Sequence, residues 1–185
     1  MQIIGGKLKG KRLLNCKSKS IRPAMGLIRK SIFDTLQDFV IDTSVLDLCA
    51  GTGILGIEAL SRGAKKLTLI DSNKISTGLI RNNLKLCNLE AKVILGSLPE
   101  SLNRKDITNE VFDLIFLDPP YGNSAFINEV LASIINKEIF SSKGLILIES
   151  ETKSKISLPN KLKLYKEKRF GNTKITYLKP SPSCF

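Results

Sequence analysis

The chain has 185 residues, 42% of them hydrophobic and 25% charged, which is typical of one globular domain with a substantial core. It contains no histidine, which excludes Ser-His and Cys-His nucleophile pairs and removes the most common general base. The formal net charge of +12 comes from two flanks, because residues 1–40 and 151–185 each hold nine Lys and Arg against two Asp and Glu. Basic flanks favour a nucleic-acid partner over a membrane surface, for which the chain offers no strongly amphipathic basic helix.

The amino-terminal segment is rich in glycine and lysine. Residues 1–15 predict a hairpin of two short strands, and residues 28–40 predict a helix because apolar residues recur at every fourth position. We expect the basic side chains of this region to contact a polyanion through Lys7, Lys9, Lys11, Arg12, Arg22 and Arg29. For Arg22 and Arg29, a solvated helix end is the structural alternative.

A glycine-rich turn follows the first apolar strand, residues 45–50. Gly51, Gly53 and Gly56 form a G-x-G-x-x-G pattern between this strand and the helix that follows. Glycine lets the backbone approach a ligand closely, and free amides at a helix start attract anionic groups. The turn expected to bind a nucleoside cofactor consists of Ala50, Gly51, Thr52, Gly53 and Gly56.

One acid ends the next strand. Asp71 follows the apolar residues 67–70 and lies twenty residues after Gly51. In a βαβ unit this position faces the ribose of a bound nucleotide, where a carboxylate accepts hydrogen bonds from the hydroxyls. The strand, the glycine turn, the helix and the acid together predict a site for an adenosine-containing cofactor.

The remaining elements alternate between helices and strands. The pattern predicts a helix at 73–86, strands at 93–95 and 112–118, a helix near 126–135, a strand at 144–148 and a closing hairpin over 162–178. No internal repeat or low-complexity linker interrupts this order. The alternation predicts an α/β fold with a doubly wound, mostly parallel sheet and an antiparallel hairpin at its carboxyl end.

The strand at 112–118 runs into a rigid acidic turn, Asp118-Pro119-Pro120-Tyr121. Two prolines forbid both strand pairing and helix entry, so the carboxylate and the following carbonyls are held at the carboxyl edge of the sheet, where α/β folds bind ligands. These acceptors suit a planar amino group, and Tyr121 is placed to stack on a base extruded from its helix. A strand end whose acid caps the next helix is the structural alternative.

Two classes of cofactor share a glycine turn followed by an acid: the nicotinamide dinucleotides and S-adenosyl-L-methionine. Asp47, in the strand before the turn, suits the ammonium group of a methionine moiety and would repel a pyrophosphate. The Asp118 turn offers a place for an amine nucleophile and no hydride partner. Both features favour S-adenosyl-L-methionine.

Cysteine spacing and apolar runs exclude several further classes. Cys16, Cys49, Cys87 and Cys184 are far apart and include no C-x-x-C pair, so we expect free thiols, two of them in the core, and no metal. No apolar run approaches the roughly 18 residues that cross a bilayer, and no secretory signal is recognisable. We therefore expect a cytoplasmic protein without a membrane partner.

Several runs of the sequence together resemble the motifs of one family. They are Ile3-Ile4-Gly5-Gly6-Lys7, Gly10-Lys11, Arg22-Pro23, Arg29 with Phe33, residues 46–53, residues 56–64, Phe116-Leu117-Asp118-Pro119-Pro120-Tyr121 and Gly171. On these runs, nearly the whole chain resembles the bacterial 16S ribosomal RNA guanine-N2 methyltransferases of the RsmD type, which are class I methyltransferases. The Asp-Pro-Pro-Tyr motif alone is shared with DNA adenine methyltransferases.

The resemblance implies a Rossmann-like, seven-stranded sheet, S-adenosyl-L-methionine as cofactor, and methylation of one guanine 2-amino group in 16S ribosomal RNA of assembling or assembled small subunits. The implied cofactor positions are Asp47, Gly51, Gly53 and Asp71, and Asp118 and Tyr121 fall on the implied catalytic turn. Ser97 falls where the family often has an Asp or Asn beside the adenine amine. Arg22 and Arg29 fall on the implied entry for RNA.

The sequence therefore predicts three segments: a basic RNA-binding extension over residues 1–40, a cofactor-binding catalytic domain over 41–179, and a loose tail over 180–185. A DNA adenine-N6 methyltransferase is the first alternative, because it shares the acidic turn. A non-catalytic RNA-binding module and a nicotinamide dehydrogenase are the others.

Overall fold

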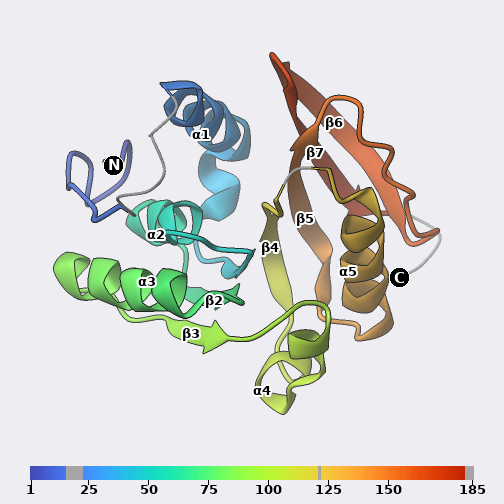
Figure 1. The fold of residues 1–185 in the computed structure, drawn as a ribbon, viewed down its shortest axis with the longest axis horizontal. Coiled ribbons are helices and arrows are strands. Elements are labelled where there is room, and N and C mark those ends of the chain that lie inside the picture. The colour runs from blue at the N-terminus through green and yellow to red at the C-terminus, as the bar shows by residue number, and fades with distance from the viewer. Residues whose placement is uncertain (16–22, 121, 182–185) are drawn as a thin grey trace.

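The computed structural model describes residues 1–15, 23–120 and 122–181. Its elements follow in the order α1 (Pro23–Leu36), η1 (Gln37–Val40), β1 (Ser44–Leu48), α2 (Ile54–Ser61), β2 (Lys66–Asp71), α3 (Lys74–Cys87), β3 (Lys92–Leu95), η2 (Glu100–Asn103), α4 (Lys105–Thr108), β4 (Phe112–Leu117), α5 (Ser124–Asn136), β5 (Phe140–Glu151), β6 (Leu162–Phe170) and β7 (Thr173–Pro180). Figure 1 shows their arrangement.

Within the described residues, seven strands form one sheet in the order β3-β2-β1-β4-β5-β7-β6. The pairs among β1 to β5 are parallel, whereas β7 is antiparallel to both β5 and β6. The strand order reverses between β1 and β4, which is the topological switch point where open α/β sheets bind ligands. The predicted fold class is confirmed, including the antiparallel hairpin at the carboxyl end.

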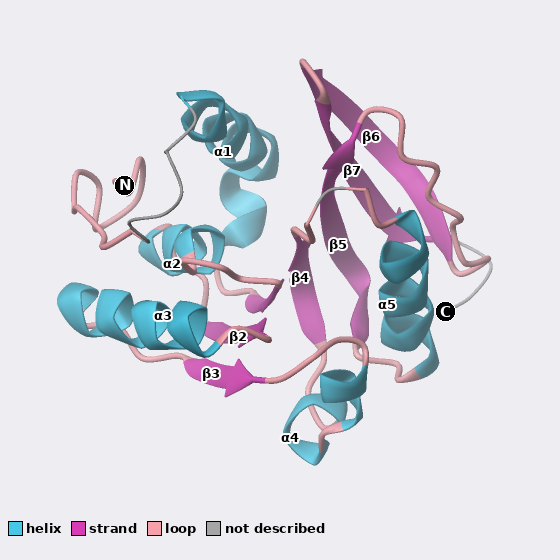
Figure 2. Ribbon diagram, in the orientation of Figure 1, coloured by secondary structure: helices cyan, strands magenta, loops and turns pink. Residues whose placement is uncertain are grey.

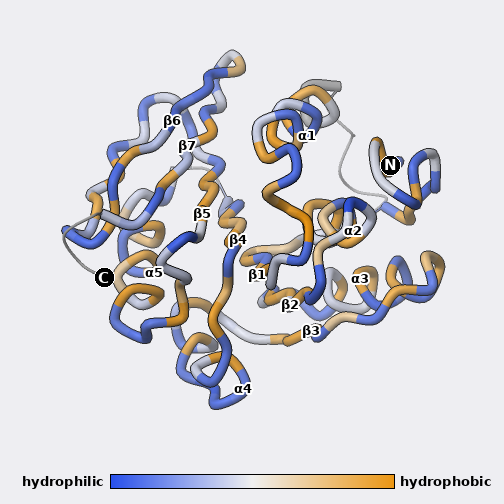
Figure 3. Tube along the Cα trace, turned by 180° about the vertical axis from the view of Figure 1, so that it is seen from behind, coloured by the Kyte–Doolittle hydropathy of each residue, from blue (hydrophilic) through white to orange (hydrophobic). Residues whose placement is uncertain are grey.

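Helices cover both faces of the sheet, as Figure 2 shows. Val45 and Phe116 belong to the core on one face, where they pack with apolar residues of α1, α2 and α3. Leu46 and Ile115 belong to the core on the other face, with residues of α4 and α5. Because both faces are buried, apolar residues predominate in the inner strands. Figure 3 shows that the edge strand β6 is more hydrophilic.

The amino-terminal segment packs on the same core as α2. Ile3 and Leu13 are buried within the cluster that also contains Ile57 of α2. The segment folds back on itself, as predicted, but its pairing is limited to a bridge between Gln2 and Arg12, so the expectation of two strands was wrong. Because glycines in this segment have no side chains, few cross-strand side-chain contacts are available to stabilise a longer ladder.

Other differences from the sequence prediction concern two short helical elements and the start of β5. The four-residue elements η2 and α4 lie in a stretch for which no helix was predicted. β5 begins at Phe140, four residues earlier than predicted, and a register shift lies between Phe112 and Leu114 where β4 pairs with it. Among the helices of the described residues, none is long and apolar enough to cross a membrane.

Candidate active site

The glycine turn is shaped by backbone conformations that favour glycine. Gly51 and Gly53 have φ of +57° and +75°, and Gly53 precedes the first residue of α2. A Cβ on Gly53 would meet Ile80 at 3.1 Å and Leu69 at 3.2 Å, so this glycine permits close packing of the turn on the core. A Cβ on Gly51 would meet only the Cys49 carbonyl oxygen, at 4.0 Å. The open side of the turn therefore lies over Gly51.

Asp47 lies beneath the turn. Its side chain is 1% exposed, and its Oδ2 accepts a hydrogen bond of 2.9 Å from the backbone amide of Gly56. Burial raises the pKa of Asp47 to about 7, against the opposing effect of the Gly56 amide and with a further increase from the charge of Asp71. In this structure Asp47 fixes the first turn of α2 to the sheet, and its contact with a ligand ammonium stays a prediction.

Asp71 closes the other side of the turn. Its Oδ2 accepts a hydrogen bond of 2.7 Å from the Gly51 amide, and its Oδ1 accepts one of 2.8 Å from the Asn73 amide. Asn73 in turn caps α3, because its Oδ1 accepts from the amide of Ile75 at 2.8 Å. The Asp71 carboxylate is therefore held at the tip of β2, beside Gly51, where the turn is open.

The three other residues expected at the cofactor lie around this centre. The Ala50 amide donates to the Ile70 carbonyl at 3.1 Å, which continues the β1–β2 ladder by one residue. The carbonyl of Thr52 accepts from Asn83 at 3.1 Å. Ser97 is exposed just after β3, next to Gly96, whose amide donates to the Asp71 carbonyl at 3.1 Å.

The acidic turn lies beside the glycine turn. Leu48 of β1 is paired with Ile70 of β2 and Leu117 of β4, so the residues that follow these three are neighbours at one edge of the sheet. They are Cys49, Asp71 and Asp118. Burial, together with the charges of Asp71, Asp118 and Asp47, raises the pKa of the Cys49 thiol to about 12, which reflects how closely the three carboxylates surround it.

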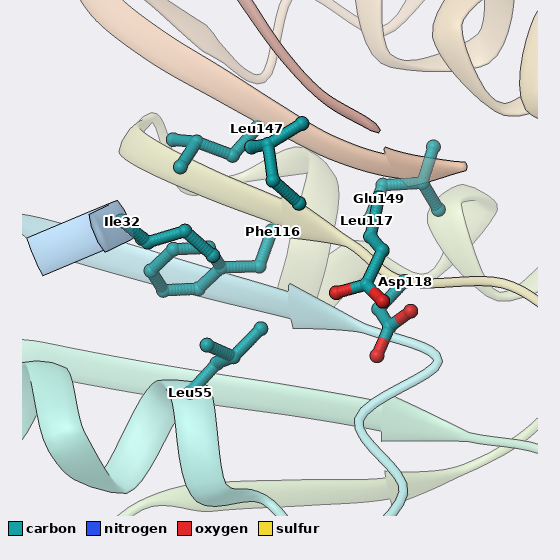
Figure 4. A pocket seen from close by; sticks show the side chains of 8 residues that line it. Ile32, Leu55, Phe116, Leu117, Asp118, Leu147 and Glu149 are labelled. Atoms are coloured by element: carbon teal, nitrogen blue, oxygen red, sulfur yellow. The ribbon is translucent and has the colours of Figure 1, made fainter. Parts of the chain in front are cut away.

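A small pocket opens next to Asp118. Its apolar part is formed by Ile32, Leu55, Phe116, Leu117, Leu147 and Ile175, which come from α1, α2 and three strands. The carboxylates of Asp118 and Glu149 stand together at its rim (Figure 4). The pocket thus has an apolar floor with two carboxylates at its rim. Pro119 is buried behind Asp118, and Tyr121 lies outside the described residues.

The basic residues of the amino-terminal segment differ in their surroundings. Lys7, Lys9, Lys11 and Arg12 are exposed on the segment that packs on α2, and Arg22 lies outside the described residues.

Arg29 is placed differently from the prediction. It is 7% exposed, its Nη2 donates to the Gln2 carbonyl at 2.7 Å, and its Nε lies 3.6 Å from Glu58, which is fully buried. Burial lowers the pKa of Arg29, and the charge of Glu58 opposes that shift. The expectation that Arg29 contacts RNA was wrong, because its side chain instead joins the amino-terminal segment to α2.

Three polar residues at this site were not predicted. Glu58 accepts from the Ile4 amide at 2.9 Å besides pairing with Arg29 and with Arg62, the latter at 2.9 Å. Asn83 joins the amino-terminal segment to the glycine turn, because it accepts from the Leu14 amide at 2.8 Å and donates to Thr52. Glu58 and Asn83 could have been identified from the sequence, because each is a polar residue on the apolar side of a helix. Glu149 was predicted only as a strand end.

Comparisons with known proteins identify the family. The family described as conserved hypothetical protein 95 matches residues 1–179. The chain is 33% identical to "Ribosomal RNA small subunit methyltransferase D" of Buchnera aphidicola subsp. Acyrthosiphon pisum over 167 residues, which are 90% of this chain and 86% of the relative. The solved structure of "Putative methyltransferase yhhF" from Escherichia coli superposes with a TM-score of 0.86 at 27% identity and covers 98% of both chains.

A more distant structure, of SMU.776 complexed with SAH, has a TM-score of 0.70 at 15% identity and covers 86% of this chain and 50% of that one, so it shows the shared methyltransferase fold alone. Together with the matched residues 1–179 and the Buchnera relative, the geometry of the two turns leads to one conclusion. The chain belongs to the ribosomal RNA small subunit methyltransferase D family, described as conserved hypothetical protein 95.

Proposed function

We propose that this methyltransferase transfers a methyl group from S-adenosyl-L-methionine to the 2-amino group of a guanine in 16S ribosomal RNA of the small subunit. One observation carries the proposal: Asp118 stands one strand away from β1, which enters the glycine turn, at the same edge of the sheet. Neighbouring strands are ~4.8 Å apart, so a base held by Asp118 lies within roughly 10 Å of a ligand over the turn.

The residues around the turn fit this cofactor. Asp71 offers a carboxylate at the tip of β2, where the hydroxyls of a ribose can donate to it. The space over Gly51 and the amides at the start of α2 suit the methionine part, whose carboxylate is attracted to free N–H groups. Ser97 follows β3, next to Gly96, whose amide donates to the Asp71 carbonyl, and it is the residue proposed to face the adenine. The SAH bound by the structural neighbour supports the same cofactor class.

Bound there, S-adenosyl-L-methionine would supply a methyl group on a positively charged sulfur, which an amine nitrogen can attack. The work of Asp118 is to accept a hydrogen bond from the 2-amino group, with the carbonyl of Pro119 as the second acceptor. These two bonds turn the nitrogen lone pair out of conjugation with the ring and orient it. Asp118 also stabilises the positive charge that develops on nitrogen, and a proton then leaves to the carboxylate or to water. Tyr121 is the proposed stacking partner of the extruded base.

Residues 1–40 are the proposed RNA-binding extension, and residues 41–179 the catalytic domain. The exposed Lys7, Lys9 and Lys11 support the first assignment, because a phosphate backbone binds to a group of flexible cations. Ile32 of α1 also lines the pocket beside Asp118, so the extension contributes to the place where the base would sit. Ribosomal RNA as substrate implies work in the cytoplasm.

Methyl transfer to small ribosomal subunits and to duplex DNA, measured side by side with the purified chain and labelled S-adenosyl-L-methionine, tests this function. We expect label in the RNA of the subunits and none in DNA. Label in DNA would instead identify an adenine methyltransferase. Failure to bind S-adenosyl-L-methionine in an equilibrium titration would leave an RNA-binding module, and binding of a nicotinamide dinucleotide would indicate a dehydrogenase.

A further inference from the structure

Glu149 occupies the register position next to Asp118. Leu117 of β4 is paired with Ile148 of β5, and the two strands are parallel, so the residues that follow this pair are neighbours. Side chains alternate along strands, and both acids fall on the same face as Phe116 and Leu147, the face covered by α1 and α2.

The two carboxylates are directed into the same pocket. Asp118 and Glu149 both line it, and Figure 4 shows their carboxylate groups next to each other, to the right of Phe116 and Leu55. Each side chain is half-buried, and the two carboxylates lie at the rim of the pocket. Two neighbouring ionised carboxylates can only accept hydrogen bonds, and they repel each other. A ligand with two adjacent hydrogen-bond donors therefore binds favourably between them.

Guanine has the matching pattern on its Watson–Crick edge, where the N1–H donor is adjacent to the 2-amino group. Adenine has an acceptor at N1 in the same position. We propose that Glu149 is the specificity-determining residue for guanine: it accepts a hydrogen bond from N1–H while Asp118 accepts one from the 2-amino group. This inference rests on the proposed function and adds to it the contact that selects the base.

The physical consequence is rejection of any base with an acceptor at N1. Such a base would place a ring nitrogen lone pair against the negative Glu149 carboxylate, so that two acceptors would face each other without a hydrogen between them. Sites built around a substrate N–H reject an analogue without it far more strongly than apolar pockets reject a change of size. The carboxylate therefore selects the base through its negative charge and not through shape.

2-Aminopurine tests the contact directly, because it keeps the 2-amino group and has an acceptor at N1. We would first map the guanine that the wild-type protein methylates. Small subunits would then be reconstituted from RNA that carries either guanine or 2-aminopurine at that position, and kcat/KM measured on both. The variant is Glu149→Gln, whose amide can donate to an N1 acceptor. The matched control is Glu138→Gln, at the exposed turn before the other end of β5.

We expect the wild type and the control to prefer guanine by about 100-fold or more, and Glu149→Gln to narrow that preference at least about tenfold. If the variant is too slow to measure, dissociation constants are measured in the presence of S-adenosylhomocysteine for subunits with guanine and for subunits with 2-aminopurine. The ratio of these two constants must then be smaller for Glu149→Gln than for the wild type by the same factor. An unchanged preference, or equal losses on both bases, would overturn the role of Glu149 while leaving guanine methylation intact. A wild type that forms no N2-methylguanosine would overturn the proposed function itself.

Discussion

The backbone amide of Asp118 donates a hydrogen bond to the carbonyl oxygen of Leu48 at 3.3 Å. This bond continues the β1–β4 ladder one residue beyond β4 and joins the acidic turn to the strand that enters the glycine turn. The proline after Asp118 cannot donate to the ladder, so pairing stops at that point. The two turns are therefore fixed relative to each other by strand register, and the site needs no closing motion to bring them together.

Asp118→Asn tests the acidic turn. We expect the rate of methyl transfer to fall by about 10²–10³, because the amide replaces a charged acceptor with a neutral one at the nitrogen where charge develops. The affinity for S-adenosyl-L-methionine, measured by titration calorimetry, should stay within a few-fold. Asp106→Asn is the matched control, since Asp106 is paired with Arg104 on the exposed side of α4. A near-normal rate for Asp118→Asn would refute the catalytic assignment.

Asp47 makes the stability of the protein depend on pH. Its pKa is about 7 in the folded state against an ordinary 3.8, so the folded state binds a proton more tightly than the unfolded state. The contribution of Asp47 to the free energy of unfolding is then most favourable below about pH 4 and decreases as the pH rises from about 4 to about 7, by up to about 1.4 kcal/mol per pH unit.

We expect Asp47→Asn to remove this contribution while the amide oxygen still accepts from Gly56. Urea unfolding of both proteins from about pH 4 to about pH 8 measures it. As the pH rises across that range, the free energy of unfolding of the variant should increase relative to that of the wild type by at most about 4 kcal/mol. Two stability curves that run parallel would show that Asp47 is not protonated in the folded protein near pH 6.

Arg29→Ala should destabilise the protein without a specific effect on RNA binding. The change leaves the buried Glu58 with Arg62 as an ion-pair partner and removes the bond to the Gln2 carbonyl. Breaking a buried pair in this way costs about 3 kcal/mol in the free energy of unfolding. The neighbouring Lys30→Ala is the control, because Lys30 forms an exposed pair with Asp34, worth less than about 1 kcal/mol. Equal small losses for both variants would contradict the structural role.

The amino-terminal lysines should determine how RNA binding depends on salt. We expect the triple variant Lys7→Ala, Lys9→Ala and Lys11→Ala to bind small-subunit RNA more weakly. The slope of log K against log salt should fall by about 1 for each phosphate that the variant no longer neutralises. The control removes three exposed lysines elsewhere, Lys65, Lys66 and Lys137, and so changes the net charge equally. If both triple variants lower the slope alike, the effect is one of net charge and the extension is not the RNA-binding surface.

Local patterns in the sequence were sufficient to predict that the seven strands of the sheet and the two turns exist, but not where β5 begins or how the amino-terminal segment pairs. An apolar run that ends in an acid or in glycine marks a buried parallel strand whose tip is at the ligand-binding edge, and Asp71 and Asp118 both lie there. The sequence alone did not predict that Glu149 stands beside Asp118, because this depends on which strands are neighbours. The order of strands is set by tertiary packing, and Glu149 is 31 positions from Asp118 in the chain.

Arg29 shows the opposite error. A basic residue near a helix start is usually exposed, and composition gave no reason to treat it differently from Lys9 or Lys11. Arg29 of α1 is buried because it pairs with Glu58, which lies on the apolar side of α2. Buried charges need partners, so a lone acid among apolar helical residues is the feature that could have indicated a buried partner.

The most direct test of the central claim is the identity of the methylated nucleoside. Small subunits that lack the modification would be incubated with the purified chain and isotopically labelled S-adenosyl-L-methionine, and their RNA digested and analysed by mass spectrometry. We predict labelled N2-methylguanosine with the wild type and only a trace with Asp118→Asn. Labelled N6-methyladenosine, or N2-methylguanosine formed equally well by the variant, would contradict the account.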